Sequence, residues 1–220
     1  MMSKLSIYIH WPYCLSKCPY CDFNSHVSDK KIDQEEFLEL IEKEIDYHGK
    51  YIDNKKISSI FFGGGTPSLM DPNIIERILA RLSSRCSIEN DTEITMEANP
   101  TSVELQKFRD YSNIGINRIS IGVQSLDNDD LKNLGRTHTA ELAIKAIGIA
   151  QRYFDSVSID LIYARPGQNE KTWKLELERA LSLQTQHLSL YQLTIEPNTI
   201  YEKLYKSGKI KLPNESLSNE

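Results

Sequence analysis

The feature that most constrains the fold is the alternation of short apolar segments with longer amphipathic ones along most of the 220 residues. The short segments are rich in Ile, Val, Tyr and Phe, a composition typical of β-strands. Strands that alternate with helices pair in parallel and are joined by right-handed crossovers. The sequence therefore predicts an α/β fold with six strands at residues 5–10, 57–62, 93–98, 117–122, 156–163 and 187–193.

The intervening segments have the periodicity of amphipathic helices. In the first of them, apolar residues between Phe37 and Ile45 recur on one face. Asp71 and Pro72 form a helix start, because Asp caps free N–H groups and Pro is tolerated at the first helical position. The predicted helices lie at residues 33–48, 71–84, 101–111, 127–135, 139–154 and 169–183.

Glycine or polar residues follow every predicted strand. In α/β barrels the active site is built at the carboxyl ends of the strands, whereas a doubly wound sheet concentrates its ligand contacts at one switch point. Six contributing strand ends favour a partial (βα)6 TIM-like barrel of parallel strands. In chain order, the strand ends carry a cysteine cluster, "GGGTP" at 63–67, "EANP" at 97–100, Gln124, "ARPGQ" at 164–168 and "YQLTIEPNT" at 191–199.

The charge balance and the N-terminus exclude several classes of protein. A net charge of −5 argues against binding to nucleic acid, because such proteins usually carry a basic excess. The first residues do not form a signal peptide, and no apolar run is long enough for an integral membrane segment. We therefore expect a cytoplasmic protein, in which clustered cysteines indicate metal or redox chemistry more often than disulfides.

Three of the four cysteines follow the first strand with the spacing C-x3-C-x2-C, as Cys14, Cys18 and Cys21. A tetrahedral zinc site needs four ligands, and a disulfide framework needs an even number of cysteines. Three thiolates can hold three corners of a cubane iron–sulfur cluster and leave the fourth iron open to a small molecule. A zinc site completed by His10 or His26 and a redox pair of Cys18 with Cys21 remain as alternatives.

Several other residues have simpler interpretations. Cys86 lies in an apparent helix end far from the other cysteines and is expected to be an inert thiol. His10 alternates within a strand and is expected to be a hydrogen-bonded core histidine. His138 is expected to cap a helix or contact the surface. The glycines of "GGGTP" allow positive φ and close approach of a ligand to the backbone, but no Gly-Lys-Ser/Thr follows them as in a P-loop.

Taken together, these motifs resemble the radical S-adenosylmethionine (SAM) superfamily. The strings "YIHWPYCLSKCPYCDFNSH", "FFGGGTPSLM", "EITMEANPTSVE" and "NRISIGVQSLDNDDLKNLGRTH" are similar to its oxygen-independent coproporphyrinogen oxidase-like branch. The dehydrogenases of that branch carry a further cysteine two residues after the third. Here Asp22 and Phe23 follow Cys21, as in the haem chaperones of the HemW type.

The resemblance implies a radical SAM core with two cofactors. Cys14, Cys18 and Cys21 would bind a [4Fe–4S] cluster, and the amino and carboxylate groups of SAM would chelate the open iron. One electron then cleaves SAM to methionine and a 5′-deoxyadenosyl radical. All-thiolate ligation with one replaceable site suits such low-potential chemistry.

The resemblance also implies nine SAM contacts. Tyr8 and Tyr20 match aromatic positions beside the cofactor, and Arg136 would pair with the SAM carboxylate through its guanidinium fork. Backbone groups of residues 64–66 would receive the methionine amino end, and acidic and amide side chains would bind the ammonium or the ribose. The implied contacts are Tyr8, Tyr20, Gly64, Gly65, Thr66, Glu97, Gln124, Arg136 and Asp160.

The sequence departs from the family pattern in two places. Members usually carry Gly-Leu-Pro-Gly-Gln after the fifth strand, where this chain has Ala164 and Arg165. Because Ala restricts positive φ and Arg adds a charge, we expect the geometry of this loop to differ. Members also continue for well over a hundred residues beyond the last strand seen here. We therefore expect residues 1–206 to form the core domain and residues 207–220 to begin a linker toward a further, C-terminal domain.

Three functions fit the sequence, and the resemblance implies the first two. The first is a haem chaperone that binds haem, delivers it to haem-accepting proteins and receives electrons from a donor such as flavodoxin or ferredoxin. The second is an enzyme that decarboxylates coproporphyrinogen III propionates oxidatively. The third is a zinc or structural module on a barrel scaffold. In the first two functions the radical SAM core would in principle be able to cleave SAM reductively.

Overall fold

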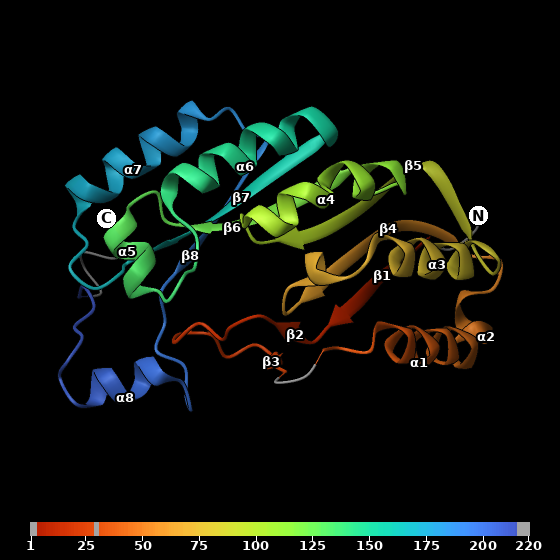
Figure 1. Ribbon diagram of the computed structural model, residues 1–220, viewed down its shortest axis with the longest axis horizontal. Helices are drawn as coiled ribbons and strands as arrows, with labels where there is room; N and C mark the ends of the chain where they lie inside the picture. Colours follow the sequence, from red (N-terminus) through yellow and green to blue (C-terminus); the bar gives the residue numbers. More distant parts are fainter. Residues whose placement is uncertain (1–3, 29–30, 215–220) are drawn as a thin grey trace.

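The computed structural model describes residues 4–28 and 31–214. Six parallel strands form one sheet in the order β1-β4-β5-β6-β7-β8, so each strand pairs with the next long strand along the chain (Figure 1). A doubly wound sheet would reverse direction at a switch point, and this sheet does not. All six predicted strands are confirmed, as a curled half-barrel: Lys4–Trp11 (β1), Lys56–Gly64 (β4), Ser87–Ala98 (β5), Arg118–Gln124 (β6), Ser156–Tyr163 (β7) and His187–Gln192 (β8).

The six predicted helices are also confirmed, within one or two residues at each end. Asp71 caps α3 as expected, since its side chain accepts a hydrogen bond from the Asn73 N–H at 3.0 Å. Along one side of the sheet, α3, α4, α6 and α7 follow one another (Figure 1). The helices span Gln34–Tyr47 (α1), Pro72–Ser83 (α3), Ser102–Asn113 (α4), Asn128–Asn133 (α5), Ala140–Tyr153 (α6) and Glu170–Ser182 (α7).

Five short elements were not predicted. They have two to seven residues and therefore lack the periodicity on which sequence analysis depends. The most consequential are a two-stranded ribbon around the cysteine segment and a helix after β8. The elements are Tyr13–Cys14 (β2), His26–Val27 (β3), Gly49–Ile52 (α2), Pro67–Leu69 (η1) and Ile200–Lys206 (α8).

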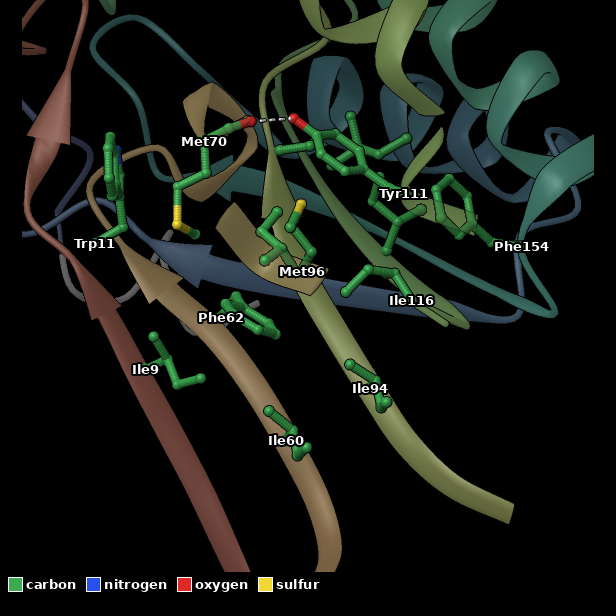
Figure 2. Close-up of a cluster of buried hydrophobic side chains, with 14 of the residues drawn as sticks. Ile9, Trp11, Ile60, Phe62, Met70, Ile94, Met96, Tyr111, Ile116 and Phe154 are labelled. Carbon is green, nitrogen blue, oxygen red and sulfur yellow. Dashed lines mark hydrogen bonds between the residues drawn. The ribbon is translucent and has the colours of Figure 1, made fainter. Parts of the chain in front are cut away.

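The hydrophobic core lies between the sheet and its covering helices (Figure 2). It is built from alternate residues of the strands, as the period of two in a β-strand requires. The buried Tyr111 hydroxyl has two carbonyl acceptors for its hydrogen, Ser68 O at 2.6 Å and Met70 O at 3.0 Å, the second of which Figure 2 draws. Labelled core residues include Ile9 and Trp11 on β1, Ile60 and Phe62 on β4, and Ile94 and Met96 on β5.

The residues between these core positions face the concave side of the sheet, and many are polar. Thr95 and Glu97 alternate with the core residues of β5. Ser120 is the partner of Glu97 on β6, and Asp160 lies two residues beyond the β7 partner of Ser120, on the same face. The Ser120 hydroxyl donates to Asp160 Oδ1 at 3.0 Å. A closed TIM barrel fills its interior with bulky apolar side chains. The polar lining of this half-barrel instead suits a bound polar ligand.

The loop after β7 retains the backbone expected of a glycine despite the substitution by Ala. Ala164 has φ +56°, in the left-handed region. Ala164 thus stands in a conformation that glycine adopts more readily, and the buried Arg165 side chain holds the loop in place through ion pairs with Asp130 and Glu176.

Replacing Ala164 with Val should lower the free energy of unfolding by about 2 kcal/mol, because a β-branched residue is strained at positive φ and the site is buried. Ala164→Gly is the matched control and should change it by less than about 1 kcal/mol, since relief of strain offsets the greater chain entropy of Gly. Urea unfolding measures both. Equal stability of the Val and Gly variants would contradict the assigned backbone conformation.

Candidate cofactor site at the carboxyl edge of the sheet

A cleft of about 420 Å³ lies at the carboxyl edge of the sheet. All three thiols of the cysteine segment line it, together with eight of the nine predicted SAM contacts. Every long strand contributes lining residues from its carboxyl-terminal part or from the loop that follows, and for β1 that loop is the cysteine segment. The structure therefore brings together Cys14, Cys18, Cys21, Tyr20, Gly64, Gly65, Thr66, Glu97, Gln124, Arg136 and Asp160.

Tyr8 is the predicted contact that does not line the cleft. Its side chain is 57% exposed and stacks on Phe61, with ring centroids 6.0 Å apart. Its hydroxyl lies 3.2 Å from Nδ1 of His10. Tyr8 pairs with Phe61 in the sheet register, three positions before the end of β1, which places it on the concave face below the cleft.

The cysteine segment is anchored to the rest of the chain at several points. The Cys21 N–H donates to the Cys18 carbonyl at 3.1 Å, which closes a tight turn between these two ligand candidates. Farther on, the Tyr201 N–H of α8 donates to the Pro19 carbonyl at 2.9 Å. Gly135 lies against the same proline, since a Cβ there would be 2.6 Å from Pro19 Cδ. Helix α8 and the turn after α5 therefore hold the segment over the sheet.

The glycines of "GGGTP" serve the packing of the cysteine segment itself. Gly65 donates its N–H to the Trp11 carbonyl at 2.6 Å, and Thr66 donates to the Tyr13 carbonyl at 2.9 Å. A Cβ at Gly65 would lie 2.6 Å from the Tyr13 carbonyl oxygen, so no larger residue fits. With the Gly64 N–H bound to Glu97 at 3.1 Å, the N–H groups of residues 64–66 are all engaged within the protein.

Arg136 reaches the cysteine segment from the turn after α5. Its Nη1 lies 3.4 Å from Cys18 Sγ, and its Nη2 donates to the Gly122 carbonyl at 2.9 Å and to Asn99 Oδ1. The guanidinium fork that was predicted to hold the SAM carboxylate thus contacts the protein's own atoms. Asn99 was not predicted as a site residue, although its position after β5 in "EANP" was the available signal.

Glu97 is half-buried where β5 enters the cleft and accepts the Gly64 N–H. Burial raises the pKa of Glu97 to about 7, with a further increase from Asp160 and a decrease from the Gly64 hydrogen bond. Burial also raises the pKa of Asp160, and the hydrogen bonds from Ser120 and Ser189 lower it by less. The cleft therefore holds two acidic groups whose ionised forms lack a full complement of partners, a setting that favours a cationic or hydroxyl-bearing ligand.

The raised pKa of Glu97 makes folding of the ligand-free chain pH-dependent. The protonated carboxyl contributes stability that is fully present below pH 4.5 and is lost as the pH rises through about 7. Glu97→Gln should therefore raise the free energy of unfolding by about 1–2 kcal/mol near pH 8 and leave it unchanged near pH 4. Urea unfolding across this pH range measures it, with Glu93→Gln, exposed on the same strand, as control. A gain at pH 4 equal to that at pH 8 would contradict the assignment.

Gln124 ends β6 with φ +66°, a conformation unusual for a residue other than glycine. Its carbonyl lies 3.4 Å from Nη1 of the buried Arg165. A Cβ at the neighbouring Gly122 would lie 3.0 Å from Gln124 Nε2, so the small residue leaves room for the Gln124 side chain in the cleft. The backbone turn at residue 124 directs the chain from the sheet toward α5.

The remaining sequence expectations have mixed outcomes. His138 was predicted to cap a helix or contact the surface, and this is wrong: it is buried, with Nε2 3.0 Å from the Val123 carbonyl. Burial and the Arg136 charge lower the pKa of His138 to about 4, so the ring is neutral and donates to Val123.

His10 is hydrogen-bonded as predicted, to Asn24 O at 2.9 Å, but only half-buried. Cys86 is buried and donates to the Leu82 carbonyl.

The donor set suits an iron–sulfur cluster better than a single zinc ion. Across residues 4–28 and 31–214, no three His, Cys, Asp or Glu side chains are grouped to hold one metal ion. A cubane cluster does not need three side chains grouped around one metal ion, because each thiolate binds a different iron. The zinc alternative also needs His10 or His26 as a fourth ligand, and neither lines the cleft that the three thiols share. Thr66 and Arg136 place hydrogen-bond donors 3.4 Å from two of the sulfurs, as the outer contacts of ligating thiolates do.

Comparison with known proteins agrees with this geometry. The family profile of the radical SAM superfamily matches residues 8–180. The chain is 42% identical over 201 residues to the heme chaperone HemW of Escherichia coli, which covers 91% of this chain and 53% of that protein. It is 38% identical over 216 residues to the mitochondrial radical S-adenosyl methionine domain-containing protein 1 of Danio rerio, covering 98% of this chain and 48% of that protein.

A solved structure gives the same result for the fold. The coproporphyrinogen III oxidase HemN of Escherichia coli, described as a radical SAM enzyme, superposes with a TM-score of 0.86 at 27% identity, covering 99% of this chain and 50% of that one. The chain thus spans about half the length of the relatives it matches. In the described part of the chain, no helix has the length and apolar character needed to cross a membrane. With the family profile matched over most of its length, the chain belongs to the radical SAM superfamily.

Proposed function

We propose that the chain is the radical SAM core of a haem chaperone, which binds haem and delivers it to acceptor proteins. The observation that carries the proposal is the cysteine segment: three thiols line one cleft, and Asp22 and Phe23 follow Cys21 in place of a further cysteine. Identity of 40% or more to proteins named heme chaperone HemW, from Escherichia coli and a Buchnera strain, supports it.

In this proposal, Cys14, Cys18 and Cys21 hold a [4Fe–4S] cluster, and Thr66 and Arg136 donate hydrogen bonds to two of the sulfurs. The cluster, when bound with SAM, supplies one electron for reductive cleavage of the sulfonium. The protein's own contribution is to hold the thiols in one loop, to leave one cluster position without a protein ligand and to shape the cleft beside it.

The cleft residues would then orient SAM. Glu97 and Asp160 present carboxyl oxygens to an ammonium or to ribose hydroxyls, and Gln124 offers an amide in the same space. Because the N–H groups of residues 64–66 are engaged, the methionine amino group would meet carbonyl oxygens there. Arg136 would bind the SAM carboxylate through the N–H groups that its contacts with Cys18, Asn99 and Gly122 do not use. Tyr20 lines the cleft, and Tyr8 extends the site along the concave face.

The partners and the location follow from the same proposal. The chain would take haem as cargo, an electron from a donor such as flavodoxin or ferredoxin, and a haem-accepting protein as recipient. All four cysteines are free, which suits a reducing, cytoplasmic compartment. We also propose that residues 1–206, which end with α8, form the core domain, and that residues 207–220 begin a linker.

Anaerobic titration of the chain with haem tests the proposal. We expect a shift of the haem absorption band that saturates at one haem per chain, and transfer of the haem to an apo-acceptor when the two proteins are mixed. The HemW protein of Escherichia coli, 42% identical over 201 residues, serves as the matched control. Saturable binding by the control and none by this chain would contradict the proposal.

The similarity to coproporphyrinogen III oxidase supports a second function, oxidative decarboxylation of a porphyrinogen. The cysteine spacing argues against it, since Asp22 and Phe23 stand where the dehydrogenases carry another cysteine. Anaerobic incubation of the reconstituted chain with coproporphyrinogen III, SAM and a reductant decides between the two. Release of carbon dioxide with a decarboxylated product would establish the second function and displace the first.

A further inference from the structure

A chain of side-chain hydrogen bonds joins two of the three thiols along the wall of the cleft. Thr66 Oγ1 lies 3.4 Å from Cys14 Sγ, and Asn99 Nδ2 lies 3.1 Å from Thr66 Oγ1. Asn99 Oδ1 accepts from Arg136, whose Nη1 lies 3.4 Å from Cys18 Sγ. Asn99 is thus the middle member, connecting the Thr66 and Arg136 side chains that touch the sulfurs.

The chemistry of these groups fixes the direction of every hydrogen bond. A guanidinium only donates, so Asn99 must present its oxygen to Arg136 and its NH₂ group to Thr66. The Thr66 hydroxyl has a single hydrogen and accepts from Asn99, which leaves that hydrogen free to point at Cys14 Sγ. Asn99 therefore orients both donors: it directs the Thr66 hydroxyl to Cys14 and holds the Arg136 guanidinium beside Cys18.

The main chain at residue 99 is held independently of this side chain. The Asn99 N–H donates to the buried Glu104 carboxylate at 2.5 Å, and Ser68 Oγ donates to the same oxygen at 2.5 Å. Gly122 borders the pair, and a Cβ there would lie in ordinary van der Waals contact with it, 3.4 Å from Arg136 Nη2 and 3.5 Å from Asn99 Oδ1. A substitution at Asn99 can thus remove the side-chain bonds while the backbone anchor remains.

We propose that Asn99 is a positioning residue of the cluster site, which orients Thr66 and Arg136 so that each donates a hydrogen bond to a cluster-binding sulfur. The inference rests on the proposed ligation of a [4Fe–4S] cluster by the three cysteines. Hydrogen bonds to ligand sulfurs stabilise the reduced, more negative cluster and raise its reduction potential. Loss of such outer contacts typically weakens metal binding about 10–100-fold.

The test compares Asn99→Ala with Asn117→Ala. Asn117 makes an equivalent pair of bonds just before β6 and away from the cleft, since its Oδ1 accepts from Ile94 N–H and its Nδ2 donates to Thr92 O, at 2.8 Å each. In the reconstituted protein, Asn99→Ala should move the midpoint potential to a more negative value and speed cluster loss to a chelator about tenfold. Asn117→Ala should leave both unchanged. In the cluster-free chain, amide exchange over residues 14–21 should rise in the first variant alone.

Two further variants keep the test decisive. Asn99→Asp keeps the volume and the acceptor for Arg136 but has no hydrogen to give Thr66, so it should lower the potential as Asn99→Ala does. Because Asn99 acts through Thr66 at Cys14, the shifts of Asn99→Ala and Thr66→Val should combine to less than their sum. If both Asn99 variants kept the wild-type midpoint potential, or if Asn117→Ala shifted it as much as Asn99→Ala, the role of Asn99 would be overturned and the proposed cluster ligation would stand. Failure of the wild-type chain to assemble any cluster would overturn the proposed ligation as well.

Discussion

Replacing Cys18 with Ala is expected to abolish assembly of the iron–sulfur cluster. The wild-type chain should take up about four iron and four sulfide after anaerobic reconstitution, and the variant close to none. The reason is that two remaining thiolates leave two irons without protein ligands in a cleft open to solvent. Iron and sulfide analysis, with the thiolate-to-iron absorption in the visible range, measures the loss. Cys14→Ala and Cys21→Ala should behave alike.

The matched control is Cys86→Ala. Cys86 is buried in the hydrophobic core between α3 and β5 and donates to the Leu82 carbonyl, away from the cleft. This variant should retain a full cluster and lose only the stability that one small buried side chain contributes. A normal cluster in any one of the three loop variants would contradict the ligand assignment. Loss of the cluster in Cys86→Ala with the fold intact would contradict it too.

Replacing Arg165 with Met should lower the free energy of unfolding by about 3–5 kcal/mol, because removal of one member of a buried ion pair leaves an uncompensated charge. The Arg165 side chain is 3% exposed and lies 2.7 Å from Asp130 Oδ2 and 2.5 Å from Glu176 Oε2. Glu176 in turn accepts hydrogen bonds from Ser125 and Leu126. The guanidinium thus ties α5 and α7 to the loop after β7. Urea unfolding of the variant measures the loss.

Arg109→Met is the control for this prediction. Arg109 is 70% exposed and pairs with Asp110 at 3.6 Å, so its loss should cost less than about 1 kcal/mol. Combining Arg165→Met with Glu176→Gln removes the stranded charge and keeps an acceptor oxygen for Ser125 and Leu126, so it should recover part of the stability. If Arg165→Met were no more destabilising than Arg109→Met, the buried network would not support the loop.

Much of the fold could be predicted because it depends on local periodicity. The strands ending at Trp11 and Gly64 and the helix starting at Pro72 all carry patterns that a single stretch of sequence displays. The order of polar groups at successive strand ends was enough to distinguish a barrel-like sheet from a doubly wound one. It also predicted that most of the site residues would line one cleft.

The rest depends on contacts between residues far apart in the sequence. Arg136 and Cys18 are 118 positions apart, and no local pattern shows that their side chains meet. His138 is buried and hydrogen-bonded to the carbonyl of Val123 on β6, 15 positions earlier, a contact that spacing alone does not reveal. Arg165 looked like an added charge in a loop, and its partners Asp130 and Glu176 come from two different helices. Such networks need the three-dimensional arrangement.

The central claim is that three thiols hold a cluster with one iron left open for SAM. The direct measurement is EPR spectroscopy of the anaerobically reconstituted and reduced chain, recorded with and without SAM. We expect the signal of a reduced [4Fe–4S] cluster whose shape changes when SAM is added, because the ligand binds the open iron. A cluster spectrum that saturating SAM leaves unchanged, or a chain that takes up zinc without iron and sulfide, would contradict the claim.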